Sequence, residues 1–532
     1  MKYPITEEDK DLLLQESLSY KMRVIVTDKN RNIIDTLYGI YNGGNLSINT
    51  ESNIRRTANF TLILDEAVNN IESKIESWLG LYYEIEIGVQ NQRTDEYKYY
   101  PCGRYCITST STNYNATANE ISFNLSDRIA ELDGTRNGQM GGALIITIPK
   151  EIDGKKQTLR GSTINILTSS TNVDKYIVDD IGEYYGMPQN NLNYEDYREK
   201  NDEWNVLPYD LEYSAGDTIG KMLFDIRDLY PNCQMYFDVY DNFCFDMIPS
   251  SENDIPDMDN DYIQKILLAD NSESVTYDVQ SIKNVTEVFG KDYDVTYVGG
   301  NAEYIDGSYH ISIENYGNGY SKSDIISFIP LNTCSENPCV KINSLDSIPI
   351  YYEYSETPLS PNELTNCNTY VFKVYKTTTG AFCAYYLGQY QPHALCILTD
   401  SEQDSKYTKD YFSRVYNVKQ DNIYFRVQPF SPFTVQKYGE VLDFKSGNEF
   451  DSILSDSIAI QNAKYCNRNS STMFDTVTIN TVLIPWLDVN VKINYAKLQE
   501  NKVYSYIVKS INHNFDSGNS EITMYRFMQL YE

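Results

Sequence analysis

The chain has 532 residues, and its 44 Lys plus Arg against 75 Asp plus Glu give a formal net charge of −31 at pH 7. This length predicts roughly three or four domains, and 41% hydrophobic and 13% aromatic residues are enough to build their cores, which argues against intrinsic disorder. The negative charge argues against proteins that hold nucleic acid or anionic membrane surfaces, because such binding needs Lys and Arg to neutralise phosphates.

The sequence predicts neither a targeting segment nor a disulfide framework. No apolar run approaches the roughly 18 residues of a transmembrane span, and the N-terminal segment MKYPITEEDKDLLLQ is acidic, so we expect neither a membrane segment nor a secretory signal. The ten cysteines include no C-x-x-C pair, and we expect reduced thiols in strand cores and loops.

The first part of the chain predicts a β-domain after a short lead-in. Residues 1–19 contain a short apolar helical pattern, and alternating apolar residues begin at Tyr20 and recur up to about residue 130. One exception is the helical spacing of Val68, Ile71, Ile75 and Trp78, which predicts a short helix. We therefore predict a first β-domain, a barrel or a sandwich, over residues 20–149.

Residues 150–253 predict an α+β middle module. Apolar residues from Ile164 to Tyr185 recur at three and four, which predicts helix up to Gly186. The clearest helix covers 216–229, and Asp217 is the expected N-cap. A hairpin follows over 235–247, with its turn at residues 240–242.

The remaining sequence predicts a second β-domain that is interrupted by an insertion. Residues 254–300 combine an acidic linker with the start of this domain, including a strand at 282–289. Residues 301–440 are rich in Tyr, Asn and Ser and predict a β-rich insertion. Residues 441–532 contain a helical pattern at 451–466 and then four strand patterns, which we assign to the remainder of the second β-domain.

No catalytic, cofactor-binding or metal-binding residue is predicted. His310, His393 and His513 lie far apart and in none of the usual motifs. Asp257, Asp259 and Asp261 imitate the start of a calcium-binding loop, but Tyr262 and Leu268 replace its required Gly and Glu, so we interpret the segment as a solvated linker. The paired Gly residues open no phosphate-binding helix, and with 75 acidic residues a carboxylate pair carries no information.

The order of several sequence stretches resembles the hub proteins of phage tails. The first domain carries four of them: Arg55–Asp65 (RRTANFTLILD), Trp78–Gly88 (WLGLYYEIEIG), Tyr100–Thr108 (YPCGRYCIT) and Ile121–Arg128 (ISFNLSDR). The later parts follow in the same order: Tyr213–Gly220 (YSAGDTIG), Lys283–Gly290 (KNVTEVFG), Leu483–Val491 (LIPWLDVNV), Val508–Gly518 (VKSINHNFDSG) and Glu521–Phe527 (EITMYRF). The insertion at 301–440 has no counterpart in this series.

The resemblance implies a fold and a function. Hub proteins of tailed phages, siphophage tail-associated proteins and the related type VI secretion spike carry two similar β-barrel tube domains per chain. The resemblance implies that residues 20–149 are the first β-barrel tube domain and that 254–300 and 441–532 form the second. Three chains then present six barrels to a six-fold tail tube and a three-fold end to the tip. We therefore expect a mainly β homotrimer with α+β modules in the virion, assembled in the host cytoplasm, that contacts a tail tube or distal tail protein, a tape-measure protein and other tip proteins.

The net charge fits a tube that conducts DNA without holding it, because an acidic channel repels phosphates. Many hub-like proteins continue into a wall-degrading domain, whereas this sequence ends at Glu532 after the second tube domain, so we expect no enzymatic activity. Two alternatives remain open. One is a receptor- or glycan-binding tail protein that uses the 301–440 insertion, and the other is a carboxylate-based glycosidase.

Overall fold

The computed structural model describes residues 3–37, 44–63, 78–114, 119–142, 146–152, 155–178, 206–229, 233–249, 256–268, 273–277, 280–334, 337–352, 356–366, 368–471, 475–498, 500 and 502–526. Strands dominate these residues and short helices accompany them, so the predicted mainly β class with α+β modules is confirmed. The predicted helical residues Val68, Ile71 and Ile75 lie outside the described residues.

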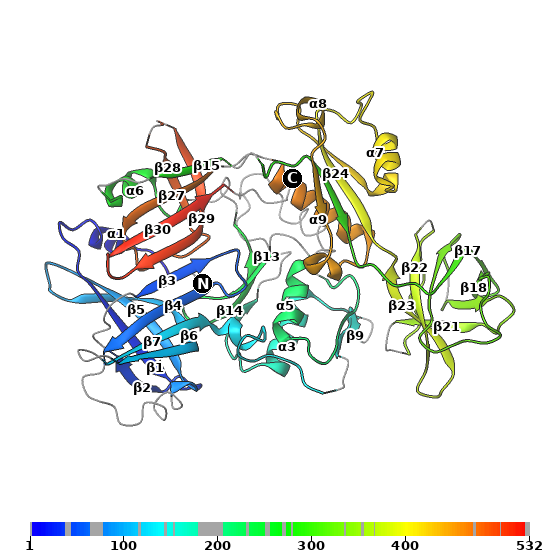
Figure 1. Cartoon of the computed structure of the whole chain (residues 1–532), viewed down its shortest axis with the longest axis horizontal. Coiled ribbons are helices and arrows are strands. Elements are labelled where there is room, and N and C mark those ends of the chain that lie inside the picture. Colours follow the sequence, from blue (N-terminus) through cyan, green and yellow to red (C-terminus); the bar gives the residue numbers. More distant parts are fainter. Residues whose placement is uncertain are drawn as a thin grey trace.

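A 12-stranded sheet joins the two ends of the chain (Figure 1, left). Its path runs β15-β27-β30-β29-β3-β4-β7-β6-β5-β1-β2, and β28 pairs with β29. The strands are β1 Tyr20–Thr27, β2 Ile33–Leu37, β3 Asn45–Asn49, β4 Arg56–Ile63, β5 Tyr82–Gln90, β6 Tyr97–Tyr114, β7 Asn119–Asp127, β15 Ser274–Tyr277, β27 Asp475–Val482, β28 Lys492–Ala496, β29 Val503–Asn514 and β30 Asn519–Tyr525. Antiparallel pairing of β29 with β3 unites the strands of the two predicted tube domains.

One face of this sheet covers the largest core of the molecule. The strands alternate buried apolar residues with more exposed polar ones, as in Asn45–Asn49, where Leu46 and Ile48 are buried. Helices α1 Glu7–Leu12 and α6 Asn260–Ile266 contribute Leu12 and Ile263 to the same core. The alternation of apolar and polar residues that predicted these strands therefore places the apolar residues in the core and the polar residues on the outer face.

The middle module follows β7 through the 3-10 helix η1 Arg128–Glu131. Its elements are β8 Ile146–Ile148, β9 Glu151–Ile152, β10 Lys155–Lys156, α3 Leu159–Ser170, β11 Tyr176–Val178, β12 Leu211–Tyr213, α5 Ile219–Asp228, β13 Cys233–Phe237 and β14 Phe243–Met247. The predicted hairpin is confirmed as β13–β14, with Asp241 at φ +65° in its turn.

Two details of the predicted middle module are wrong. Ile177 and Val178 are in a strand and not in a helix, because β11 pairs in parallel with β14. The N-cap of α5 is Thr218, whose side chain accepts a hydrogen bond from the Lys221 amide, whereas Asp217 accepts one from the Ser214 amide. The start of the first predicted helix is confirmed, because Ile164, Ile166 and Leu167 lie in α3. Its predicted end at Ile181, Tyr185 and Gly186 lies outside the described residues.

A second, four-stranded sheet has the order β25-β24-β16-β26. It combines β16 Val285–Phe289, β24 His393–Thr399, β25 Ile423–Val427 and β26 Leu442–Lys445, and its neighbours are α7 Lys409–Tyr416, η3 Gln420–Asn422, α8 Val435–Tyr438, η4 Asn448–Ser452 and α9 Asp456–Ser470. The strand predicted at 282–289 therefore exists, but it pairs with β24 and β26 and not with the large sheet. The strand that enters the large sheet at this point of the chain is β15.

The closed barrel of the structure lies within the Tyr-rich part of the chain (Figure 1, right). Its strands are β17 Tyr297–Ile305, β18 Ser308–Ile311, β19 Ile325–Pro330, β20 Cys339–Ile342, β21 Ile348–Tyr352, β22 Tyr370–Lys376 and β23 Phe382–Gln389. Figure 1 places this barrel at the opposite end of the molecule from the large sheet, with the middle module between them. The β-rich segment predicted over 301–440 thus contributes to two different β structures.

Candidate functional site

Part of the outer face of the 12-stranded sheet carries almost no charge, in contrast to β1 and β5, whose outward residues include Arg23, Glu84 and Glu86. Strand register aligns three rows of outward residues across β15, β27, β30, β29, β3, β4, β7 and β6, and we call these rows the polar face. The rows are Asn519, Asn514, Asn45, Asn59, Asn124 and Ser109; Asn480, Glu521, Asn512, Ser47 and Thr57; and Ser274, Thr478, Thr523, Ser510 and Asn49. Glu521 is the one charged residue among these sixteen.

This composition differs from that of the whole chain. Charged residues make up 22% of the sequence, so sixteen residues of average composition would include about three or four. Hydroxyl and amide side chains also bond to one another along the face: Asn124 Nδ2 donates to Ser109 Oγ at 2.9 Å, and the hydroxyls of Thr478 and Thr523 lie 3.1 Å apart. The polar face is therefore a nearly uncharged, hydrogen-bonding surface that crosses both predicted tube domains.

Three arginines fix the hairpin of the middle module against the large sheet. The Asp241 carboxylate at the hairpin turn forms three ion pairs through Oδ2, with Arg31 at 2.8 Å, Arg104 at 3.0 Å and Arg128 at 3.1 Å. We call these four residues the arginine joint. The side chains of Asp241, Arg104 and Arg128 are 1%, 3% and 6% exposed, so these charge-assisted bonds lie largely out of water, where they are strong.

A second set of contacts to the same hairpin comes from Arg55 and from Arg56 at the start of β4. Buried Arg56 donates to the Phe237 carbonyl at 2.9 Å and pairs with Asp488. Burial disfavours the charge of Asp488, but the Arg56 guanidinium holds the pKa of this carboxyl below its usual value. Arg55 and Asn490 both donate to Gln234 Oε1, at 2.7 and 2.6 Å. N-terminal and C-terminal segments therefore hold the middle module together.

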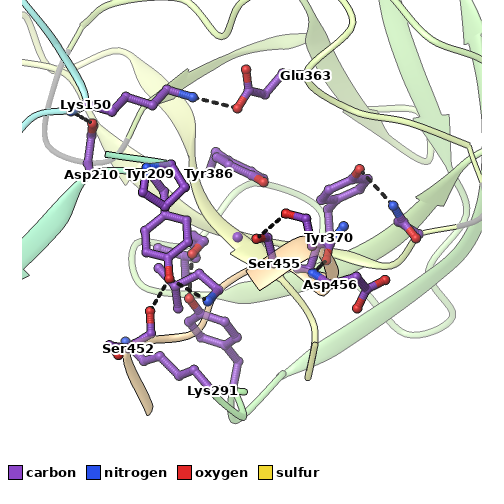
Figure 2. A pocket seen from close by; sticks show the side chains of 18 of the residues that line it. Lys150, Tyr209, Asp210, Lys291, Glu363, Tyr370, Tyr386, Ser452, Ser455 and Asp456 are labelled. Atoms are coloured by element: carbon purple, nitrogen blue, oxygen red, sulfur yellow. Dashed lines mark hydrogen bonds and ion pairs between the residues drawn. The ribbon is translucent and has the colours of Figure 1, made fainter. Parts of the chain in front are cut away.

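A cavity of about 1030 Å³ lies where the middle module, the closed barrel and the start of α9 meet. Figure 2 shows its labelled side chains around an open centre, with the Lys150–Glu363 ion pair at the top and Ser452 at the bottom. The two atoms of this pair, Nζ and Oε1, are 2.6 Å apart. No residue of the cavity was predicted as a site, because its walls come from segments that are far apart in the sequence.

The three histidines lie in separate environments and form no catalytic group. His310 is on β18 in the barrel, His393 on β24 lies 2.9 Å from Glu287 Oε1, and His513 on β29 is buried with its Nδ1 2.7 Å from Ser520 Oγ. Within the described part of the chain, no three His, Cys, Asp or Glu side chains are grouped so that they could hold a metal ion.

The acidic segment that imitates a calcium loop has structural contacts. Asp259 caps α6 by accepting a hydrogen bond from the Tyr262 amide at 2.8 Å, and Asp257 accepts one from the Lys492 amide at 2.8 Å. The segment therefore anchors α6 beside β28, and Asp257, Asp259 and Asp261 are exposed to solvent, as the sequence predicted.

None of the helices that the structure describes is both long and apolar enough to cross a bilayer.

Comparisons with known proteins give one partial family match and several similar structures. A family model described as a domain of unknown function, DUF5048, matches residues 430–531. No curated protein matches the chain.

Among solved structures, the 43 kDa tail protein of prophage MuSo2 from Shewanella oneidensis is 8% identical, with a TM-score of 0.44 over 96% of this chain and 98% of that one. The prophage tail protein gp18 from Listeria monocytogenes EGD-e is 10% identical, with a TM-score of 0.38 over 94% of each chain. The lidded Francisella PdpA–VgrG complex is 8% identical, with a TM-score of 0.39 over 96% of this chain and 53% of that one. The solved structures to which the chain is similar thus include two described as phage tail proteins.

Proposed function

We propose that the chain is a structural hub of a phage tail tip or baseplate. Three copies form a ring that joins the six-fold tail tube or distal tail ring to the three-fold tip, and the ring surrounds a channel for the viral DNA. The observation that carries this proposal is the polar face, which spans strands from both ends of the chain within one sheet. Its place in the proposed ring is the channel wall.

A wall that DNA passes must not hold phosphates. Each Lys or Arg on such a wall would gain a phosphate contact and release counterions, which is how proteins bind DNA. The polar face offers hydroxyls and amides and has Glu521 as its one charge, while the −31 net charge of the chain repels the polyanion at longer range. The sequence predicted an acidic channel. In this proposal the channel wall itself is nearly neutral, and the negative charge lies on the rest of the chain.

The sheet also offers a route to ring formation. Its path ends at β2 and β15, and edge strands present unpaired backbone groups that can pair with another chain. Ile33 on β2 is 67% exposed and Tyr277 on β15 is 47% exposed, so both edges add apolar surface. We propose that these edges meet in neighbouring copies of a homotrimer.

The partners and location follow from the same role. We propose contacts with a tail tube or distal tail protein, with the tape-measure protein and with other baseplate or receptor-binding proteins, in a virion assembled in the host cytoplasm. The DNA only passes through the channel, and we propose neither stable membrane binding nor enzymatic activity.

Sedimentation-velocity ultracentrifugation of the purified chain tests the oligomer. The proposal predicts a species of three times the 61.3 kDa chain mass, and an Ile33→Lys variant shifts it toward monomer. A matched Ile305→Lys change, at a residue 43% exposed on barrel strand β17, leaves the trimer intact. A monomer for the unaltered chain, at concentrations up to tens of micromolar, would contradict the ring.

Lysines placed on the polar face test the channel wall. The triple variant Asn59→Lys, Asn124→Lys and Asn512→Lys should retain short duplex DNA at low salt, with retention that falls steeply as salt rises. A control chain with the same three changes at exposed Asn318, Asn362 and Asn417 should retain less, because these positions lie outside the proposed channel. Equal retention by both variants would argue against a channel at the polar face.

A further inference from the structure

We propose that the cavity between the middle module, the closed barrel and α9 is a binding site for a neutral saccharide. Its volume of about 1030 Å³ lies at the upper end of the range of small-molecule sites, which suits a ligand of several rings. The inference does not depend on ring formation, because all of the walls belong to one chain.

The walls of the cavity are connected to one another by direct bonds. Lys150 on the middle module pairs with Glu363 beside the barrel at 2.6 Å, and the Tyr209 hydroxyl donates to the Ser452 carbonyl ahead of α9. The Asp456 amide at the start of α9 donates to Gln389 Oε1 on β23 at 2.6 Å. Because each wall is bonded to another, the cavity exists before a ligand arrives and little ordering cost remains for binding.

Tyrosine rings provide the flat apolar surfaces of the cavity. Tyr209, Tyr293, Tyr352, Tyr370 and Tyr386 line it, and the hydroxyls of the first four bond to protein groups, which fixes the positions of their rings. The Tyr386 hydroxyl has no hydrogen-bond partner among the residues that the structure describes, and Figure 2 shows the ring between the Lys150–Glu363 pair and Ser455. Rings of this kind pack against the C–H faces of sugars and leave one hydroxyl for a polar contact.

The charges of the cavity argue against an anionic ligand. Seven carboxylates and four lysines line it, and three of the lysines have carboxylate partners. Lys150 pairs with Glu363, Lys221 pairs with Asp225 at 2.9 Å, and Lys419 lies 3.5 Å from Asp456. A phosphate or carboxylate ligand would meet a net negative lining.

The polar groups that remain suit a ligand with many hydroxyls. The side chains of Asn366, Asp421 and Asp451 are exposed at the cavity, and their oxygens accept hydrogen bonds while the amide also donates. A purely apolar ligand would desolvate these groups without replacing their bonds with water. Flat apolar rings together with amides and carboxylates are the combination that a neutral saccharide satisfies.

Glycan-array binding by the full chain, followed by titration of the strongest neutral oligosaccharide, tests the proposal. We expect binding to neutral glycans in preference to sialylated, sulfated or phosphorylated ones. Tyr386→Phe removes one hydroxyl and should weaken binding about fivefold, the effect of one neutral hydrogen bond. Asn366→Trp should abolish binding, because the indole would occupy the cavity entrance.

Matched variants outside the cavity separate this site from any other. Tyr390→Phe and Asn318→Trp change exposed residues that do not line the cavity, and they should bind as the unaltered chain does. Three results would overturn the proposal: no neutral glycan bound, a preference for anionic glycans, or neutral binding that Asn366→Trp leaves unchanged while circular dichroism shows the variant folded.

Discussion

The arginine joint gives the sharpest quantitative prediction. Asp241→Asn removes the negative charge on which Arg31, Arg104 and Arg128 converge and keeps the size of the side chain. Asn also tolerates the positive φ of +65° at this position, so backbone strain does not enter the comparison. The substitution therefore isolates the charge.

The expected loss follows from the burial of the joint. Breaking a buried ion pair costs about 3–5 kcal/mol, because the remaining charges stay out of water without a partner. Arg104 and Arg128 keep Glu84 and Glu131 within 3.4 and 3.0 Å, so we expect the lower end, about 3 kcal/mol. This loss corresponds to about a hundredfold faster amide hydrogen exchange in β13 and β14, provided that local opening governs their exchange.

The control for this prediction is Asp306→Asn. Asp306 is also in a hairpin turn at positive φ, +49°, but it is exposed and has no ion pair among the described residues. Exchange in its own hairpin, β17–β18, should change little. The reasoning is refuted if Asp241→Asn accelerates exchange in β13–β14 by no more than Asp306→Asn does in β17–β18.

Three further substitutions test other parts of the fold. Burial lowers the pKa of His513 to about 4, so between pH 6.5 and 4 the unfolded chain binds a proton that the folded chain does not. The unfolding free energy at β29, measured by urea-dependent hydrogen exchange, should therefore fall by about 3 kcal/mol as the pH is lowered over this window. In His513→Asn this dependence on pH should vanish. Thr218→Ala removes the N-cap of α5 and should cost about 1 kcal/mol in thermal unfolding, whereas Thr218→Ser should cost little. Gly138→Ala should lower the melting temperature more than Gly142→Ala: both sites have positive φ, but a Cβ at Gly138 would lie 2.2 Å from the Leu132 carbonyl oxygen, whereas at Gly142 it would meet open space.

Local patterns in the sequence were sufficient for hairpins and isolated helices. The β13–β14 hairpin and helix α5 are specified by residues within about a dozen positions of one another, so alternation, helical spacing and turn residues predict them. The N-cap assignment was wrong by one residue because Asp217 and Thr218 are both good caps, and the choice depends on the backbone geometry of the turn before the helix.

Pairing over long sequence distances could not be predicted in the same way. β16 has a clear strand pattern, but its neighbours β24 and β26 begin more than a hundred residues later. β11 has three residues, too few to distinguish strand from helix, and its parallel partner β14 decides its conformation. The contact between β3 and β29 likewise joins residues that no local signal connects.

The candidate sites follow the same rule. The alternation Asn45-Leu-Ser-Ile-Asn49 reveals polar outward positions, yet the uncharged face becomes visible only when the register aligns these positions with β4 and β29. The cavity unites segments from Lys150 to Ile460. The arginine joint unites Arg31 from the turn between β1 and β2, Arg104 from β6 and Arg128 from η1. No single motif could have indicated either site.

The measurement that tests the central claim most directly is negative-stain imaging of the purified chain, with class averages analysed for symmetry. The hub account predicts three-fold rings with an open centre, whose inner surface in a reconstruction is the polar face of the 12-stranded sheet. Particles without a channel, or rings in which the polar face points away from the centre, would contradict it.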